Sequence, residues 1–248
     1  MPEPFPLALV TGAARRLGKA FALTLARHGF AILLHYNSSG NEFPATAAEI
    51  AALGVPVFPL QADLTDAAQI TLLFSAIDEI IARQAGLIAP LSVLVNSAAR
   101  MRRADARSLS AVEFDAGLAI NLRAPFLCAQ QAFLRMQPGG LIVNLSDVGA
   151  GRAWTGYPDY AVGKSGLESL TRNLARAFAP GVRVNAIAPG LVLPADDMSP
   201  DEWERLVGRL PLRRSASLAE ITSTLEFLLK NEYITGQTIV VDGGYSLL

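Results

Sequence analysis

The sequence predicts a doubly wound α/β domain: a seven-stranded parallel sheet covered by helices on both faces. Short apolar runs alternate along the chain with longer helical stretches, and each run is continuously apolar, as a strand buried on both faces requires. Of 248 residues, 51% are hydrophobic and 17% charged, which suffices for one large core. No repeat, low-complexity tract or linker-like change in composition divides the chain, so we expect one domain over residues 1–248.

Each element is expected where its pattern is clearest. The strands are expected at Leu7–Val10, Ala31–Tyr36, Val57–Gln61, Ser92–Val95, Leu141–Leu145, Val182–Ile187 and Thr238–Val241. The helices are expected at about 16–29, 42–53, 66–85, 108–136, 158–179 and 216–230. Sheets of this kind bind ligands beyond the carboxyl ends of their strands, and every motif below follows a predicted strand.

Composition narrows the class of protein. The formal net charge of −1 gives no reason to expect nucleic acid or an anionic membrane as a partner. One cysteine, Cys128, excludes an internal disulfide and fits a reducing cytosol, so we expect a cytoplasmic protein. Met1–Pro6 lacks the basic residues of a signal peptide, and no apolar run approaches the roughly 20 residues that span a membrane. We expect no metal ion in the site.

A glycine loop joins the first strand to the first helix, as Thr11-Gly12-Ala13-Ala14-Arg15-Arg16-Leu17-Gly18. Gly12 permits a tight turn, Gly18 permits close packing of the helix, and the helix N-terminus attracts a pyrophosphate. Arg16 stands where the common pattern has its middle glycine. We therefore expect Gly12, Arg15, Arg16, Leu17 and Gly18 to hold a dinucleotide.

The end of the second strand indicates which dinucleotide. An acid here would bind the ribose hydroxyls of NAD, but the segment 35–40 has none, and the first acid afterwards is Glu42. Arg15 and two serine hydroxyls could instead bind a 2′-phosphate, which favours NADPH. The alternative, a solvated helix start, is disfavoured because two arginines there oppose the helix dipole. The cofactor residues expected from this segment are His35, Tyr36, Ser38 and Ser39.

Two further strand ends complete the expected cofactor site. Asp63 and Leu64 follow the third strand, where Asp63 either fixes the adenine or caps the next helix. Small residues after the fourth strand let the cofactor cross the sheet edge, and they are Asn96, Ser97 and Ala98.

The chemistry is predicted from Tyr160 and Lys164, which lie four residues apart on one face of a helix. A free tyrosine has a pKa of about 10, too high for easy proton exchange near neutrality. A neighbouring ammonium group lowers that pKa, so the pair fits proton transfer to a substrate.

Together these motifs, with Asn121, Pro189-Gly190 and Val241–Gly244, resemble the short-chain dehydrogenase/reductase family along the whole chain. The resemblance implies that Tyr160 donates the proton and Lys164 also binds the nicotinamide ribose. It implies that Asn121 holds a water behind Lys164 and that Pro189, Gly190 and Val192 contact the nicotinamide. It also implies a homotetramer, which the long apolar-striped helices favour.

One position departs from the family pattern. Most members carry a serine thirteen residues before the tyrosine, but here Asp147 occupies that place, unless a slip of one residue recruits Ser146. An aspartate there resembles the pteridine reductase branch, to which several other segments are similar: Ala13–Gly18, His35-Tyr36, Asp196-Asp197-Met198 with Trp203, and Tyr233–Gly236 leading to Gly243–Leu247. A carboxylate opposes the negative charge of a reduced ketone but stabilises a protonated ring nitrogen, so Asp147 favours C=N substrates.

Arg100 weighs against the pterin reading, because pteridine reductases have an aromatic residue at the matching position. The substrate residues expected are Arg16, Arg100, Asp147, Trp154, Tyr157, Leu191 and Leu193, beneath a cover formed by 195–209. We therefore expect an NADPH-dependent pterin reductase, with a reductase of 3-oxoacyl thioesters or other ketones as the alternative. A nucleotide-sensing binding protein is the remote third.

Overall fold

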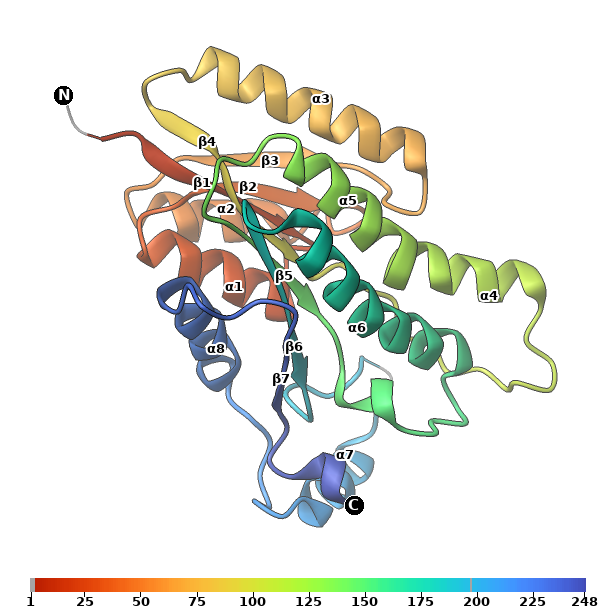
Figure 1. Ribbon diagram of the computed structural model, residues 1–248. Helices are drawn as coiled ribbons and strands as arrows, with labels where there is room; N and C mark the ends of the chain where they lie inside the picture. The colour runs from red at the N-terminus through yellow and green to blue at the C-terminus, as the bar shows by residue number, and fades with distance from the viewer. Residues whose placement is uncertain (1–2, 197) are drawn as a thin grey trace.

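The computed structural model describes residues 3–196 and 198–248 and contains the predicted seven-stranded parallel sheet (Figure 1). Its strands are β1 (Phe5–Thr11), β2 (Ala31–Tyr36), β3 (Val57–Gln61), β4 (Ile88–Asn96), β5 (Gly140–Leu145), β6 (Val182–Pro189) and β7 (Thr238–Val241). Their order is β3-β2-β1-β4-β5-β6-β7, with all neighbours parallel. The direction of winding reverses between β1 and β4, where ligands bind in such sheets. The predicted fold class is confirmed.

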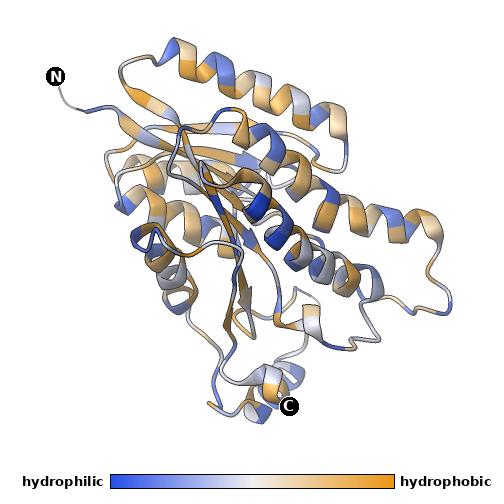
Figure 2. Cartoon of the chain, in the orientation of Figure 1, coloured by the Kyte–Doolittle hydropathy of each residue, from blue (hydrophilic) through white to orange (hydrophobic). Residues whose placement is uncertain are grey.

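Helices cover both faces of the sheet. They are α1 (Arg16–Arg27), α2 (Phe43–Ala51), α3 (Ala67–Arg83), α4 (Ala111–Leu118), α5 (Ala124–Phe133), α6 (Pro158–Phe178), α7 (Pro200–Arg209) and α8 (Leu218–Lys230). One core cluster joins the sheet to α1, α2 and α8, and the other joins it to α3, α5 and α6. Hydrophobic and hydrophilic residues mix along these helices (Figure 2), because most of them bury one face and expose the other.

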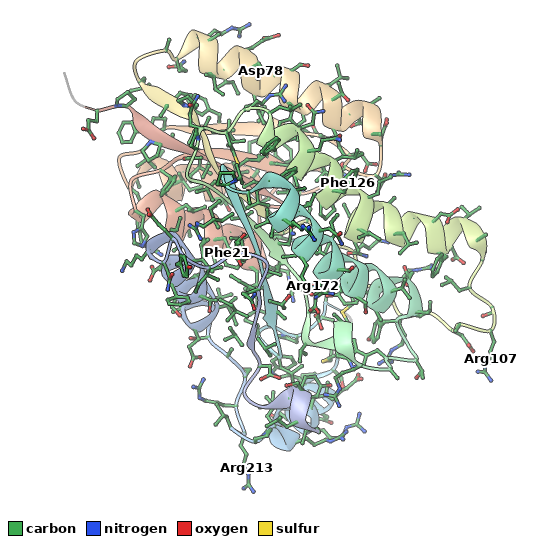
Figure 3. The ribbon with its side chains drawn as sticks, viewed as in Figure 1. Phe21, Asp78, Arg107, Phe126, Arg172 and Arg213 are labelled. Carbon is green, nitrogen blue, oxygen red and sulfur yellow. The ribbon has the colours of Figure 1, made fainter. Side chains whose placement is uncertain are left out.

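The core explains why these segments take these places. Phe21 of α1 and Phe74 of α3 are fully buried on opposite faces of the central strands (Phe21 is labelled in Figure 3). Each large side chain removed from water contributes about 1.5–3 kcal/mol before chain entropy is counted. The two layers therefore hold the carboxyl edge of the sheet rigidly.

The predicted helix 108–136 is interrupted. α4 begins at a capping box between Ser110 and Glu113 and ends in a π-helical turn, Ala119–Arg123, before α5 continues. Pro125 has no N–H to donate to the carbonyl of Asn121, so the regular α-helical bond is lost there.

The cover contains a helix that the sequence did not predict. The Ser199 hydroxyl accepts the N–H of Glu202 and starts α7, none of whose residues is buried. Figure 1 shows α7 beyond the sheet, at the end of the molecule where the C-terminus is marked. Within residues 3–196 and 198–248, no helix combines the length and the apolar character that crossing a bilayer demands. Asp197 lies outside the described residues.

Candidate active site

A cleft of about 760 Å³ opens at the carboxyl edge of the sheet. It is lined by every predicted site residue except Asn96 and Asn121. The lining runs from the glycine loop, past the ends of β2 and β3, to Tyr160 and the cover. The topology thus brings together residues that are far apart in sequence.

The glycine loop has the geometry of a phosphate cradle. Gly12 has a φ of +64°, and a Cβ there would lie 2.9 Å from Ala98 Cα, so only glycine fits. Thr11 Oγ1 accepts the N–H groups of Ser97 and Ala98, both at 3.0 Å, and joins this loop to the end of β4. α1 has neither a side-chain cap nor an acidic residue in its first turn, which leaves its N-terminus suited to an anion. The site therefore fits a dinucleotide.

His35 supports the cradle from beneath. Its Nδ1 accepts the N–H of Gly12 at 3.1 Å, so Nε2 carries the proton and donates to the Ala62 carbonyl at 3.0 Å. The ring is only 1% exposed, and burial lowers its pKa to about 4. His35 thus lines the cleft with both ring nitrogens engaged inside the protein.

Arg15 and Arg16 are partly exposed, and both are joined to the cover. Arg16 has a φ of +52°, so it keeps the left-handed conformation of the glycine it replaces. Its guanidinium donates to the carbonyls of Leu193 and Pro194 and to Asp196. Arg15 also reaches Asp196, at 3.4 Å. The carboxylate of Asp196 is therefore paired with the two arginines that we expected to bind a phosphate.

The part of the cleft beside the end of β2 is lined by hydroxyl groups. Ser38 and Ser39 line it, whereas the nearby acid Glu42 is turned to Arg15 at 3.8 Å. Asp63 accepts the N–H and hydroxyl of Thr65 in a tight turn, while Asp66 caps α3. Helix capping therefore belongs to Asp66.

Tyr160 and Asp147 form the centre of the site. The Tyr160 hydroxyl donates to Asp147 Oδ2 at 2.9 Å, and Asp147 Oδ1 accepts the N–H of Gly149 at 2.7 Å. Burial and the neighbouring carboxylate raise the pKa of Tyr160 well above 10. Burial also raises the pKa of Asp147. The phenol is therefore held in its protonated form.

Lys164 acts differently from our expectation. Its ammonium donates to the Leu145 carbonyl at 2.6 Å and lies 5.6 Å from the centre of the Tyr160 ring. Burial lowers the pKa of Lys164 to about 8. The predicted lowering of the Tyr160 pKa is wrong for this structure, because burial and Asp147 outweigh the cation.

The side chains of Ser146 and Asp147 point in different directions. The Ser146 hydroxyl donates to Glu168 at 2.9 Å, whereas Asp147 faces the phenol. Asp147, and not Ser146, therefore faces the Tyr160 hydroxyl.

Two predicted site residues lie outside the cleft lining. Asn121 is fully buried in the π-helical turn, where its side chain accepts the Arg100 N–H and donates to the Arg100 carbonyl. Asn96 donates to Asn144 at 2.9 Å and to the Pro125 carbonyl, beneath the site. Both position backbone that the cleft uses.

The substrate end is aromatic. Trp154 packs against Tyr157 and Tyr245, with ring centres 5.9 and 6.4 Å away. Arg152 donates to the Tyr245 carbonyl and lies over its ring. Tyr245 and Trp203 line the cleft but were not among the predicted site residues. Their only sequence signal was membership in segments similar to the pteridine reductase branch.

A family model described as Enoyl-(Acyl carrier protein) reductase matches residues 12–246. The chain belongs to the short-chain dehydrogenase/reductase family. This family member is 36% identical over 244 residues to the 3-oxoacyl-(acyl-carrier-protein) reductase FabG of Staphylococcus aureus, covering 96% of each chain.

Two solved structures of family members are also similar. One is FolM alternative dihydrofolate reductase 1 from Brucella canis with NADP, with a TM-score of 0.86 and 35% identity over 98% of this chain and 94% of that one. The other is the angucycline C-6 ketoreductase LanV with bound NADP, with a TM-score of 0.91 and 29% identity over 98% and 96%. The first fits the resemblance to the pteridine reductase branch.

Proposed function

We propose that this family member is an NADPH-dependent reductase of pterins or dihydropterins. The observation that carries the proposal is the hydrogen bond from Tyr160 to Asp147 on the floor of the cleft. A carboxylate in this place stabilises a protonated ring nitrogen and opposes an alkoxide, so it favours C=N over C=O reduction. FolM, among the similar structures, is named as a dihydrofolate reductase.

The residues divide the work. When bound, the cofactor supplies the hydride, which goes to the ring carbon. Tyr160 donates its proton to the ring nitrogen, and Asp147 stabilises the positive charge that develops there. Lys164 keeps a positive charge beneath the site, and Asn121 fixes the neighbouring loop at Arg100.

The cofactor preference rests on the glycine cradle and on the absence of a carboxylate facing the cleft at Asn37–Ser39. Arg15 and the two serines bind the 2′-phosphate, and Arg16 binds the pyrophosphate in place of Asp196. Both similar structures were solved with NADP.

The first experiment follows NADPH absorbance with a dihydropterin and, separately, with a 3-oxoacyl thioester. We expect dihydropterin turnover, lost by a factor of about 10²–10⁴ in Tyr160→Phe and Asp147→Ala with NADPH affinity kept. Asp147→Ser is expected to gain ketone turnover as it loses pterin turnover.

The main alternative is ketone reduction, favoured by the FabG relatives. Ketone turnover by the wild type that Asp147→Ser leaves unchanged, with none of a dihydropterin, would establish it. NADPH binding without turnover of either compound would instead indicate a nucleotide-sensing protein.

We also propose a homotetramer. Leu118, Leu122, Phe126 and Leu170 surround an apolar groove of about 630 Å³ between α4, α5 and α6, and Phe126 of α5 is labelled in Figure 3. A second copy of this chain would cover that face. Light scattering that gives a monomer mass at micromolar concentration would refute it.

A further inference from the structure

The loop after β4 carries four arginines, three of which have acidic partners. Arg102 pairs with Glu113 at 2.7 Å, Arg103 with Glu202 at 3.2 Å, and Arg107 with Asp105 at 2.6 Å. Arg100 lines the cleft, is exposed, and has no side-chain hydrogen bond or ion pair to any described residue.

The backbone of Arg100 is nevertheless firmly placed. The buried Asn121 side chain accepts its N–H at 3.2 Å and donates to its carbonyl at 2.9 Å. The other cleft arginines, Arg15 and Arg16, are already joined to Asp196. The charge of Arg100 is therefore held at the rim of the site without a protein partner among the described residues.

We propose that Arg100 binds an anionic group on the substrate, a carboxylate on the tail that extends away from the ring being reduced. This rests on the proposed pterin reduction and narrows its substrate class to dihydropterins with an acidic tail. A guanidinium matches a carboxylate with two parallel hydrogen bonds, and its planar shape is already oriented for them. Tyr157 and Trp203 line the same cleft and offer apolar surface to the tail.

The test compares two substrates with NADPH: 7,8-dihydrofolate, whose tail ends in carboxylates, and 7,8-dihydrobiopterin, whose tail is uncharged. In Arg100→Met we expect the KM for dihydrofolate to rise about tenfold with kcat unchanged, as for one lost charge-assisted contact at a partly exposed site. The KM for dihydrobiopterin should stay within about twofold. Arg100→Lys should retain most of the affinity for dihydrofolate. In the wild type, added salt should weaken the binding of dihydrofolate but not that of dihydrobiopterin.

Arg107→Met is the matched control, because it removes the same charge from the same loop at a residue paired elsewhere. It should leave both KM values unchanged. Equal losses for both substrates in Arg100→Met would overturn the proposal, since they would show stacking or a structural role.

If the wild type reduces neither compound, the proposed function fails. Calorimetry on the NADPH-loaded protein then decides the inference independently. Tighter binding of dihydrofolate than of dihydrobiopterin, lost in Arg100→Met, supports it, and equal affinities refute it.

Discussion

At the scale of single residues, the proton that Tyr160 would donate is held by its surroundings. Burial and Asp147 both raise the pKa of the phenol, so the group stays protonated over the working range of pH. Lys164 is the member of the site whose charge changes near neutrality, because burial lowers its pKa to about 8.

The first prediction concerns pH. Lys164 is an ammonium below its pKa and loses its charge above it, so kcat/KM should fall as pH rises through about 8. Steady-state assays with a dihydropterin across this range measure the midpoint. Lys164→Arg, whose charge persists, should retain its residual rate at alkaline pH. A wild-type rate that stays level well above pH 8 would show that the charge is not needed.

Much of the site could be predicted because its motifs are local. Tyr160 and Lys164 share a helix face by spacing alone, and Gly12 and Gly18 follow a strand. Pairing across the chain could not be predicted: Arg16 meets Asp196 from 180 residues away. The same holds for Ser146, whose hydroxyl turns to Glu168 only once α6 packs against β5.

At the scale of elements, α4 lies unusually close to α6. A Cβ at Gly117 would lie 2.7 Å from both Cβ and Cγ of Asp159, which is 1% exposed. Asp159 Oδ1 has no hydrogen-bond partner among the described residues. The contact therefore depends on the absence of a side chain at Gly117.

A double-mutant cycle tests this contact. Gly117→Ala should lower the free energy of unfolding by about 1–3 kcal/mol, because two buried groups overlap. In the Asp159→Gly background the same change should cost less than half as much, since the Cβ and the carboxylate of Asp159 are then both absent. Denaturant unfolding of the four proteins gives the coupling. If the costs of the two substitutions simply add, the two positions do not interact, which would show that α4 and α6 can move apart freely.

His35 joins three strand ends, and its pKa makes that link sensitive to acid. The folded pKa of about 4 lies below the ordinary 6.5, so protons favour the unfolded chain between these values. The contribution of His35 to stability is complete above about pH 6.5 and shrinks as pH falls toward 4, by roughly 3 kcal/mol in all.

Urea unfolding at several pH values measures this effect. The stability curves of the wild type and His35→Gln should converge as pH falls from 6.5 to 4. His28, the other histidine of the chain, is exposed, so His28→Gln is the control for replacing an imidazole and should lower the stability at neutral pH less than His35→Gln does. Parallel curves for His35→Gln would contradict the assignment.

The elements that could be predicted are those with a strong pattern. All seven strands follow apolar runs, and five of them are largely buried under helices, whereas no residue of the edge strands β3 and β7 is fully buried. α7 has no buried residue, so it lacks the apolar stripe that reveals a helix. The interruption of the helix predicted at 108–136 depends on the one N–H that Pro125 lacks. The spacing of apolar residues gives no sign of that missing donor.

At the scale of the whole molecule, the cleft is lined by residues at the ends of nearly all the strands. A ligand that fills it should stabilise the entire fold. NADPH at a hundred times its Kd adds about 2.7 kcal/mol, which should raise the Tm by roughly 5–10 °C. NADH at the same concentration should raise it less, and Arg15→Gln should narrow the difference. Differential scanning fluorimetry measures both, and equal shifts would contradict the preference for NADPH.

The contact of Asp196 with Arg15 and Arg16 has one more consequence. If these arginines take the cofactor's phosphates, Asp196 is a competitor tethered to the same chain, present at a constant effective concentration. Dilution cannot remove a tethered competitor. The measured affinity for NADPH is therefore reduced by the free energy needed to displace the loop. By thermodynamic linkage the effect is reciprocal. Bound NADPH weakens the contact between the loop and the arginines by the same factor by which that contact weakens NADPH binding. The cover of the substrate site would then report whether the nucleotide is bound, in either redox state.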